Sequence, residues 1–554
     1  MIEKKIADFI DSALSDEASL SGFYNRDMLI LESPKDPSHG DIATNIAFRM
    51  AKPLKKNPKD LAENISKILG SALAMSPLKI EIDGIEPLNG FINMRLSAGA
   101  LRDVIKQVRA AGTKFGMSDT GKGTKVQVEF VSANPTGTLS VAHARQAAFG
   151  DSLSNILSAN GYDVTREYYI NDEGVQIAVL GRSIYARYRE LIGDKYEFPE
   201  NGYRGEYIRE MAVRFREEYG DRYKAETPEN LKVYSEWGCD YLLNEIKKEL
   251  LDFGVKFDVW FSQKALGTSG KIEGTLDVLD KKGLLYESEG ALWFKSTMFG
   301  DDKDRVVKKS DGAYTYVTPD IAYHKDKFER GFKKVIDILG PDHHGYINRI
   351  KAAVQALGYP AGAVNIIIIQ LATLYKNGQP VKMSTRAGEY ITLREVLDEV
   401  GKDAARFFLL MRKASAHLDF DLELAKKQTQ ENPVFYVQYA HARISSIIAA
   451  AKVSEGQIDK ADLGLLCAPE ELNLFRELRQ YPAIVRLSAQ EEDPYRIITY
   501  LQALAACFHK FYEADKVITE DAALTEARLY LISCVRQVLA NGLTLLGVSC
   551  PAKM

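Results

Sequence analysis

Residues 125–170 decide the fold, and they begin with KVQVEFVS at 125–132, where apolar and polar residues alternate as in a strand. A turn-rich loop follows, and a helix with one apolar face is expected from about Ser140. Asn160–Gly161 should end this helix, since both residues tolerate the left-handed conformation. Tyr162–Ile170 then has the pattern of a second strand. A strand–helix–strand unit of this length predicts a parallel, right-handed crossover.

The alternation of strand and helix continues further along the chain. Strands are expected at Val335–Leu339 and Val364–Gln370, with a helix between them from about Gly345 to Leu357. Such alternation is typical of a parallel sheet with helices on both faces. We therefore expect residues 120–430 to form an α/β domain with a Rossmann-like, doubly wound parallel sheet and an insertion around 185–315.

The residues before this domain have a mixed pattern. Helical spacing at Ile2–Leu14 and Ile42–Met50 is combined with strand-like runs at Met28–Glu32 and Ile80–Ile85. Residues 1–115 are therefore expected to be a separate α+β domain.

From residue 432 to residue 554 the strand signals disappear. The apolar residues recur at helical spacing in Phe435–Ile447, Leu472–Leu487, Pro494–Tyr512 and Leu524–Leu546. This pattern predicts an all-α helix bundle. The arginines that could form a basic face on it are Arg443, Arg476, Arg479, Arg486 and Arg496. An ordinary solvated surface explains the same charges equally well.

The composition gives no indication of a disordered, fibrous or membrane protein. Hydrophobic residues make up 46% and charged residues 27%, as in ordinary globular proteins. The net charge of −4 does not exclude a nucleic-acid partner, because binding depends on where basic residues cluster. The strongest apolar run, Ile366–Ile369, is too short to span a membrane, and the N-terminus lacks the apolar stretch of a signal peptide. We expect a cytoplasmic protein with no membrane partner.

The five cysteines lie far apart and form no CxxC or Cys/His cluster. They are expected to be small buried thiols in a reducing compartment, and no metal site is expected.

The first candidate site is the loop that follows the strand at 125–132. It runs SANPTGTL from Ser132 and leads into a helix that begins near Ser140. Gly137 allows close approach of a ligand, and the helix directs its positive end at whatever binds there. His143, in the first turn, can donate to an anion. The alternative is an ordinary strand–helix turn with a surface histidine.

The second candidate is VKMSTRAG at 381–388, which contains Lys382, Ser384 and Arg386. Such a loop suits negative charge that develops on a leaving pyrophosphate. The alternative is a solvated basic loop.

Two further candidates follow other expected elements. In DILGPDHH (337–344) the adjacent His343 and His344 point apart, so a ligand contact is favoured over chelation of a metal. In YVTPD (316–320) Thr318 is expected to cap a helix that has Pro319 at its first position. Asp320 would then either complement the helix dipole or bind a ligand.

These elements resemble the signatures of class I aminoacyl-tRNA synthetases. SVAH at 140–143 is similar to the HIGH signature, and VKMST at 381–385 is similar to KMSKS. Longer stretches resemble the arginyl-tRNA synthetase family: VSANPTGTLSVAHAR (131–145), REYYINDEGVQ (166–176), GPDHHGYINR (340–349) and NPVFYVQYAHAR (432–443). The resemblance covers essentially the whole chain. It makes 1–115 a tRNA-contacting domain, 120–430 the catalytic domain and 432–554 an anticodon-binding domain.

The resemblance implies that ATP and L-arginine react to form arginyl-adenylate, with release of pyrophosphate, and that arginine then passes to tRNA(Arg). His143 and Ser140 would lie near the phosphates of ATP, with Lys382 and Ser384 closing on them. Further nucleotide contacts would come from Gly137, Ala142, Asp342, Met383 and Arg386. ATP would enter with Mg²⁺, no tightly bound cofactor is expected, and the enzyme is expected to be a monomer.

The resemblance also implies an arginine pocket. Ser132 and Asn134 would contact the main chain of the amino acid, Tyr316 and Asp320 its guanidinium, and His343 the same pocket. A buried carboxylate with a hydroxyl suits a guanidinium, which stays protonated and presents five donors.

The sequence departs from the family pattern at several positions. Ser140 stands in place of the first histidine of HIGH and Ala142 in place of its glycine. Thr385 replaces the second lysine of KMSKS, and Gly137 stands where some relatives have a lysine. Two other functions therefore stay open: a ligase for another amino acid or amine, and a tRNA-binding relative that no longer catalyses.

Overall fold

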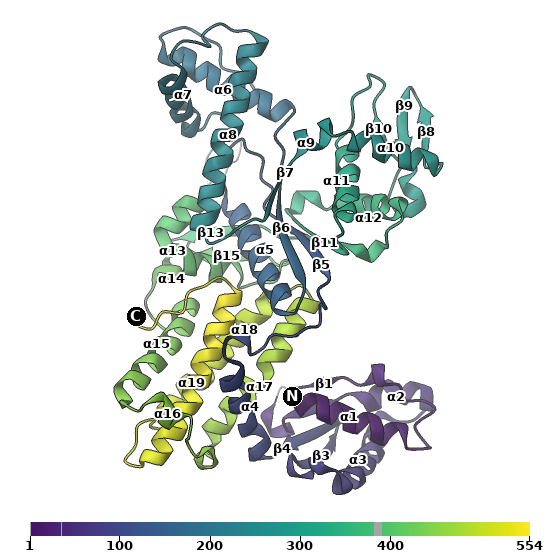
Figure 1. The fold of residues 1–554 in the computed structure, drawn as a ribbon, viewed down its shortest axis with the longest axis vertical. Helices are drawn as coiled ribbons and strands as arrows, with labels where there is room; N and C mark the ends of the chain where they lie inside the picture. Colours follow the sequence, from purple (N-terminus) through teal and green to yellow (C-terminus); the bar gives the residue numbers. More distant parts are fainter. Residues whose placement is uncertain (1, 35, 382–390) are drawn as a thin grey trace.

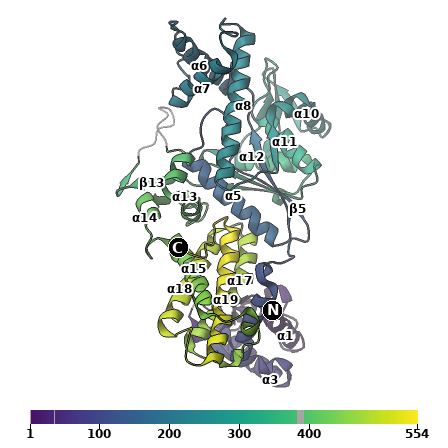
Figure 2. The same ribbon diagram turned by 60° about the vertical axis from the view of Figure 1, so that its left-hand side comes forward.

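The computed structural model describes residues 2–34, 36–381 and 391–554. A central α/β domain carries a group of helices at one end, at the top of Figure 1. The N-terminal domain and the C-terminal helices lie together at the opposite end, and Figure 2 shows the same arrangement after rotation.

The centre of the molecule is a five-stranded sheet in the order β12-β11-β5-β6-β7. Its strands are β5 Lys125–Glu129, β6 Asp163–Ile170, β7 Val259–Ser262, β11 Lys334–Leu339 and β12 Val364–Ile368. All four pairings are parallel, as the sequence predicts. The chain moves outward from β5 to β6 and β7 on one side, and β11 and β12 lie on the other. The carboxyl end of β5 is therefore a switch point, where open α/β sheets bind their ligands.

The crossover helix α5, Val141–Ala159, is buried along most of its length. One side packs on the sheet, and the other is covered by C-terminal helices. The Arg406 guanidinium donates to Asp151 of α5 at 2.5 Å, and Asn155 donates to the carbonyl of Leu545 at 3.2 Å. A helix that is enclosed in this way holds the loop before it in a fixed position.

The N-terminal domain is an antiparallel sheet in the order β1-β2-β4-β3, covered by helices. Its elements are α1 Ile2–Ser15, β1 Leu31–Glu32, β2 Ile42–Thr44, α2 Ile46–Leu54, α3 Pro58–Met75, β3 Ile82–Leu88, β4 Phe91–Leu96 and α4 Ala98–Ala111. The helix predicted over Ile42–Met50 is wrong for its first residues, which form β2. All residues of β2 are buried, and a fully buried strand has no alternation that would distinguish it from a helix.

The stretch expected as one insertion around 185–315 contains β7, which pairs with β6. The added residues therefore form two parts. The first part holds α6 Val175–Leu191, α7 Glu206–Tyr219 and α8 Pro228–Asp252 around a core of aromatic side chains. The second holds α9 Gln263–Thr268, α10 Lys271–Lys281, the sheet β8 Leu285–Ser288, β9 Ala291–Phe294 and β10 Arg305–Lys308, and α11 Val317–Glu329.

The rest of the described residues are mostly helical, apart from a small sheet. After α12 Tyr346–Leu357 come β13 Ala372–Lys376, β14 Gln379–Pro380, α13 Leu393–Leu409, β15 Leu418–Asp421 and α14 Leu422–Lys426. The bundle is α15 Pro433–Ala451, α16 Glu455–Ile458, α17 Pro469–Gln490, α18 Tyr495–Ala514 and α19 Ala522–Leu545.

The signature at 432–443 begins α15 and fixes the end of the chain against it. Asn432 caps the helix by accepting from the Val434 and Phe435 amides. Gln438 donates to Asp403 and to the carbonyl of Ser549, each at 2.9 Å. These contacts give part of the motif a structural role.

Two of the arginines considered for a basic face connect domains instead. Arg479 is 8% exposed and donates to Glu3 at 2.7 Å and to the carbonyl of Asp41 at 2.6 Å. Arg476 donates to the Asp41 carboxylate at 2.6 Å. The idea that these arginines face solvent is wrong, because the N-terminal domain docks on α17.

Cys239 and Cys534 are buried as expected, but Cys467 is exposed. No helix in the described part of the chain is long and apolar enough to cross a membrane.

Candidate active site

A cavity of about 420 Å³ lies at the carboxyl ends of β5 and β11. The predicted site residues that line it are Ser132, Asn134, His143, Tyr316, Asp320, Asp342 and His343. They come from segments that are far apart in the sequence, and these segments meet at the switch point of the sheet, beside the carboxyl end of β5. A neighbouring cavity of about 630 Å³ shares Asn134 and His143 and is lined also by Gly137 and Ser140.

The other predicted residues have different positions. Ala142 is half-buried on α5 and lines neither of these cavities. Lys382, Met383, Ser384 and Arg386 lie outside the described residues.

The loop after β5 turns sharply because Val131 and Ser132 adopt positive φ angles of 69° and 40°. Such angles are rare for a β-branched residue and are strained. The Ser132 hydroxyl stabilises the turn by donating to Glu129 at 3.1 Å and accepting from the Tyr169 amide at 3.1 Å. Asn134 donates to Gln176 at 2.7 Å. The strained turn thus directs Ser132 and Asn134 toward the cavity.

His143 lies one turn inside α5. Its Nδ1 accepts from the Ser140 amide at 3.1 Å, and burial lowers the pKa of His143 to about 4. The ring is therefore neutral near pH 7 and carries its proton on Nε2, since Nδ1 is the acceptor. His143 can donate a hydrogen bond to an anion without adding a full charge.

Arg145, in the same signature, does not face either cavity. It is 2% exposed and donates to the carbonyls of Gln370 at 2.7 Å, Ala416 at 3.0 Å and Lys413 at 3.1 Å. It fixes the start of α5 to the segments around β13 and β15.

The helix that carries Asp320 begins differently from the prediction. α11 starts at Val317 with Tyr316 at its N-cap, and the Thr318 hydroxyl donates to the carbonyl of Val307. The predicted cap at Thr318 is wrong because the helix already begins at Val317, so Thr318 lies inside its first turn and its hydroxyl binds β10. Asp320 still lies in the first turn, and burial raises its pKa to about 6.

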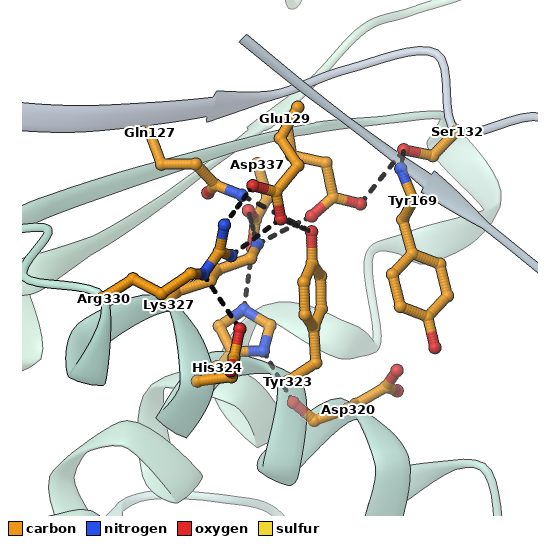
Figure 3. A network of polar contacts seen from close by, with 12 residues as sticks. Gln127, Glu129, Ser132, Tyr169, Asp320, Tyr323, His324, Lys327, Arg330 and Asp337 are labelled. Atoms are coloured by element: carbon orange, nitrogen blue, oxygen red, sulfur yellow. Dashed lines mark hydrogen bonds and ion pairs between the residues drawn. The ribbon is translucent and has the colours of Figure 1, made fainter. Parts of the chain in front are cut away.

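Figure 3 shows a polar network that extends from Asp320 to Glu129 and Asp337. Lys327, 0% exposed, donates to Glu129 at 2.6 Å and to Asp337 at 2.7 Å. His324 lies 2.9 Å from the other Asp337 oxygen, and its Nδ1 lies 2.8 Å from the carbonyl of Asp320. The network therefore connects the Glu129 side of the cavity with the base of Asp320.

Sequence reasoning quoted Glu129 and Asp337 within longer stretches but gave them no role, and it did not select Lys327. A signal was present, because Asp337 is a lone carboxylate inside the apolar strand VIDIL (335–339). Alternation in KVQVEFVS predicts a strand but does not say what covers its polar face, on which Gln127 and Glu129 are buried.

The charges around the 420 Å³ cavity are mostly negative. Glu129, Asp320, Asp337 and Asp342 line it, and no Lys or Arg among the described residues does. Lys327 behind the wall offsets part of this charge. The cavity suits a cationic group that offers several donors.

The parallel sheet, the cavity at its switch point and the helical C-terminal part agree with the family models that match the chain, which show a class I aminoacyl-tRNA synthetase. Residues 104–445 match the model of the class I (R) tRNA synthetase catalytic domain, 1–96 that of the arginyl tRNA synthetase N terminal domain, and 437–554 that of the DALR anticodon binding domain.

Comparison with individual proteins identifies the family within this class. The arginine–tRNA ligase of Geobacter sp. (strain M21) is 50% identical over 529 residues, 95% of this chain and 94% of that protein. The arginine–tRNA ligase of Bacillus pumilus (strain SAFR-032) is 47% identical over 556 residues, 100% of this chain and 98% of that protein. The structure of Thermus thermophilus arginyl-tRNA synthetase, 22% identical, has the same fold with a TM-score of 0.79 and covers 100% of both chains. The chain belongs to the arginyl-tRNA synthetase family.

Proposed function

We propose that this protein ligates L-arginine to tRNA(Arg). The arginine carboxylate attacks the α-phosphorus of ATP, which forms arginyl-adenylate and releases pyrophosphate. The 2′-hydroxyl of the terminal adenosine of tRNA then attacks the arginyl carbonyl, and AMP leaves. The observation that carries the proposal is the cavity with Asp320 and Glu129 in its wall, in a chain of this family.

Asp320 and Glu129 are the groups that recognise the guanidinium in this proposal. Asp320, with a pKa of about 6, is ionised near pH 7, and a bound guanidinium would favour the ionised form further. Glu129 already accepts from Lys327 and Ser132, so its direction is fixed before substrate binds. Tyr316, 76% exposed beside the cavity, can close over the side chain. Lysine offers fewer donors and would leave carboxylate oxygens unpaired, which is how such a site rejects it.

The main chain of arginine would lie against Ser132 and Asn134, with His343 at the same cavity. This position directs its carboxylate toward His143, which lines both cavities. The neutral Nε2–H of His143 would donate to a phosphate oxygen or to the reacting carboxylate.

ATP would occupy the 630 Å³ cavity beside Gly137 and Ser140. Of the other nucleotide contacts that the resemblance implies, Asp342 lines the adjoining 420 Å³ cavity, and Ala142 lines neither cavity. By resemblance, Lys382 and Ser384 stabilise the charge of the leaving pyrophosphate, with Met383 and Arg386 beside them. Mg²⁺ would enter with ATP, because it keeps waters and phosphate oxygens as most of its ligands. No cluster of three or more His, Cys, Asp or Glu side chains among the described residues could hold a metal by itself.

An aromatic face on α15 and α18 supports an RNA partner for the C-terminal helices. Phe435 stacks on Tyr439 with ring centroids 5.7 Å apart, and Tyr439 stacks on His509 at 6.1 Å. The Arg443 guanidinium lies 4.9 Å from the Tyr439 ring and 4.5 Å from the Tyr512 ring. Aromatic rings beside an arginine are what unpaired bases stack on, so we propose that the anticodon loop binds here.

Arginine-dependent exchange of pyrophosphate into ATP, with and without tRNA, tests the function. We expect exchange with arginine but not with lysine, a requirement for tRNA, and loss of exchange in Asp320→Asn. Exchange with another amino acid would favour a different ligase. Binding of tRNA without any exchange would identify a relative that holds tRNA but does not charge it. Light scattering should give the mass of a monomer.

A further inference from the structure

The segment between α6 and α7 forms one wall of the 630 Å³ cavity. Its residues 200–205 and Tyr207 line this cavity together with Ser140 and His143. In Figure 1 these helices belong to the group at the top of the molecule, next to the carboxyl end of the sheet. The wall therefore comes from the insertion and not from the parallel sheet.

This segment is held in place by its own contacts. The Tyr207 hydroxyl donates to the carbonyl of Thr136 at 2.8 Å, which joins the segment to the loop after β5. The Tyr203 amide donates to the Ser183 hydroxyl of α6 at 3.0 Å, and the Gly202 amide closes a turn on the carbonyl of Pro199 at 2.9 Å. These contacts thus fix the position of the segment that forms this wall of the cavity.

Arg204 is the only Lys or Arg among the described residues that lines either cavity. Its guanidinium lies 4.9 Å from the centroid of the Phe198 ring. No carboxylate in the described part of the chain forms an ion pair with it, although Glu200 lines the same cavity. Stacking limits the rotamers of Arg204 and leaves its donors available, so less entropy is lost when it binds a ligand.

The charges around the two cavities indicate what Arg204 can bind. The carboxylates Glu129, Asp320, Asp337 and Asp342 line the first cavity, and His143 is neutral. A triphosphate is negatively charged and is repelled by these carboxylates. Its binding is therefore favourable only if a cation lies close to the phosphates.

We propose that Arg204 binds the triphosphate of ATP from the insertion side of the 630 Å³ cavity. The inference rests on the site proposed above, in which ATP lies beside Ser140 and His143. Arginine suits this role because its planar, always charged fork matches phosphate oxygens. It would supply a fixed cation where the loop after β5 offers only Gly137, Ser140 and the neutral His143.

The test is the KM for ATP in pyrophosphate exchange, at saturating arginine and tRNA, for the wild type and Arg204→Gln. Losing a charge-assisted hydrogen bond at an exposed side chain should raise this KM about tenfold. Arg204→Lys should restore part of the loss. Rising KCl should raise the wild-type KM more steeply than that of Arg204→Gln, because salt screens only the charged contact.

Two matched variants complete the experiment. Arg187 stacks on the same Phe198 ring at 4.6 Å, pairs with Glu190 and lines neither cavity, so Arg187→Gln should leave the KM for ATP unchanged. Glu200→Gln removes a negative charge from the cavity wall and should lower the KM about twofold. A KM for ATP that rises in the Arg204 variant and falls in the Glu200 variant would identify an electrostatic effect on the nucleotide.

The other outcomes overturn the proposal. A KM for ATP within twofold of wild type in Arg204→Gln would exclude the contact. A raised KM for tRNA with an unchanged KM for ATP would mean that the phosphate belongs to the 3′ end of tRNA. Absence of exchange in the wild type itself would instead refute the function, so the two failures are distinguishable.

Discussion

Replacing Lys327 by methionine tests whether the buried network holds the active site together. The Lys327 ammonium is fully buried and lies 2.6 Å from Glu129 and 2.7 Å from Asp337. It also lies 4.2 Å from the centroid of the Tyr323 ring. Methionine keeps the length of the side chain but removes every one of these contacts, so two buried carboxylates lose their counter-ion.

The expected loss is about 3–5 kcal/mol in the free energy of unfolding, because removing one partner leaves uncompensated buried charge. With a urea m-value of about 3 kcal/mol per M, the unfolding midpoint should fall by about 1 M or more. The KM for arginine should rise as well, since Glu129 lines the cavity.

The loss should depend on pH with a definite sign. Burial raises the pKa of Asp337, but Lys327 and His324 outweigh it and hold the pKa below its ordinary value. A depressed carboxylate contributes stability above its unfolded pKa of about 4, and this contribution is lost as pH falls further. The difference between wild type and Lys327→Met should therefore be largest near pH 7 and shrink below about pH 4.

Urea unfolding followed by far-UV circular dichroism measures this effect. The control is Lys271→Met, whose lysine pairs with Asp326 from a position that is 47% exposed. Arg330 still pairs with Asp326 at 2.9 Å, so the control should lose less than about 1 kcal/mol. A Lys327→Met variant as stable as this control at pH 7 would refute the reasoning.

Three further predictions concern other parts of the molecule. In the proposed site the carboxylate form of Asp320 binds the guanidinium. Because the pKa of Asp320 is about 6, wild-type kcat/KM for arginine should then fall as pH drops below 6. Asp320→Asn should lower it about 100-fold or more and remove that step, and an unchanged profile would contradict the assignment. His143→Asn should lower the rate constant of single-turnover adenylate formation about 100-fold. The pKa of His143 is about 4, so a change in the wild-type rate near pH 6.5 that the variant abolished would contradict a neutral His143. Arg479→Met should weaken the docking of the N-terminal domain by about 2–3 kcal/mol, seen as faster limited proteolysis after α4. Cleavage at the wild-type rate would show that the contacts of Arg479 with Glu3 and the Asp41 carbonyl do not hold this domain.

Local sequence patterns gave most of the elements that carry the site. The strands at 125–132, 162–170, 335–339 and 364–370 all appear in the parallel sheet, with boundaries that differ by a few residues. The predictions failed where burial removes the pattern, as in β2, and where a helix begins before the residue expected to cap it, as at Thr318.

The site illustrates the same division. The resemblance selected Ser132, Asn134, Tyr316, Asp320 and His343, and these residues line one cavity. It did not select Lys327 or Arg204, because their surroundings are made by segments distant in sequence. Lys327 meets Glu129 across 198 positions, a contact that no local pattern can indicate.

The sequence alone determined four of the five strands of the parallel sheet, their order along the chain and the family, since hydrophobic period and motif spacing are properties of neighbouring residues. Only the tertiary structure decided what the polar face of β5 does. Alternation places Gln127 and Glu129 on that face, but whether it meets water depends on what packs against it. Here α11 covers the face and brings Tyr323 and Lys327 to it. A charged face that would be solvated on an open sheet therefore becomes the buried wall of the 420 Å³ cavity, because both faces of a parallel sheet are covered.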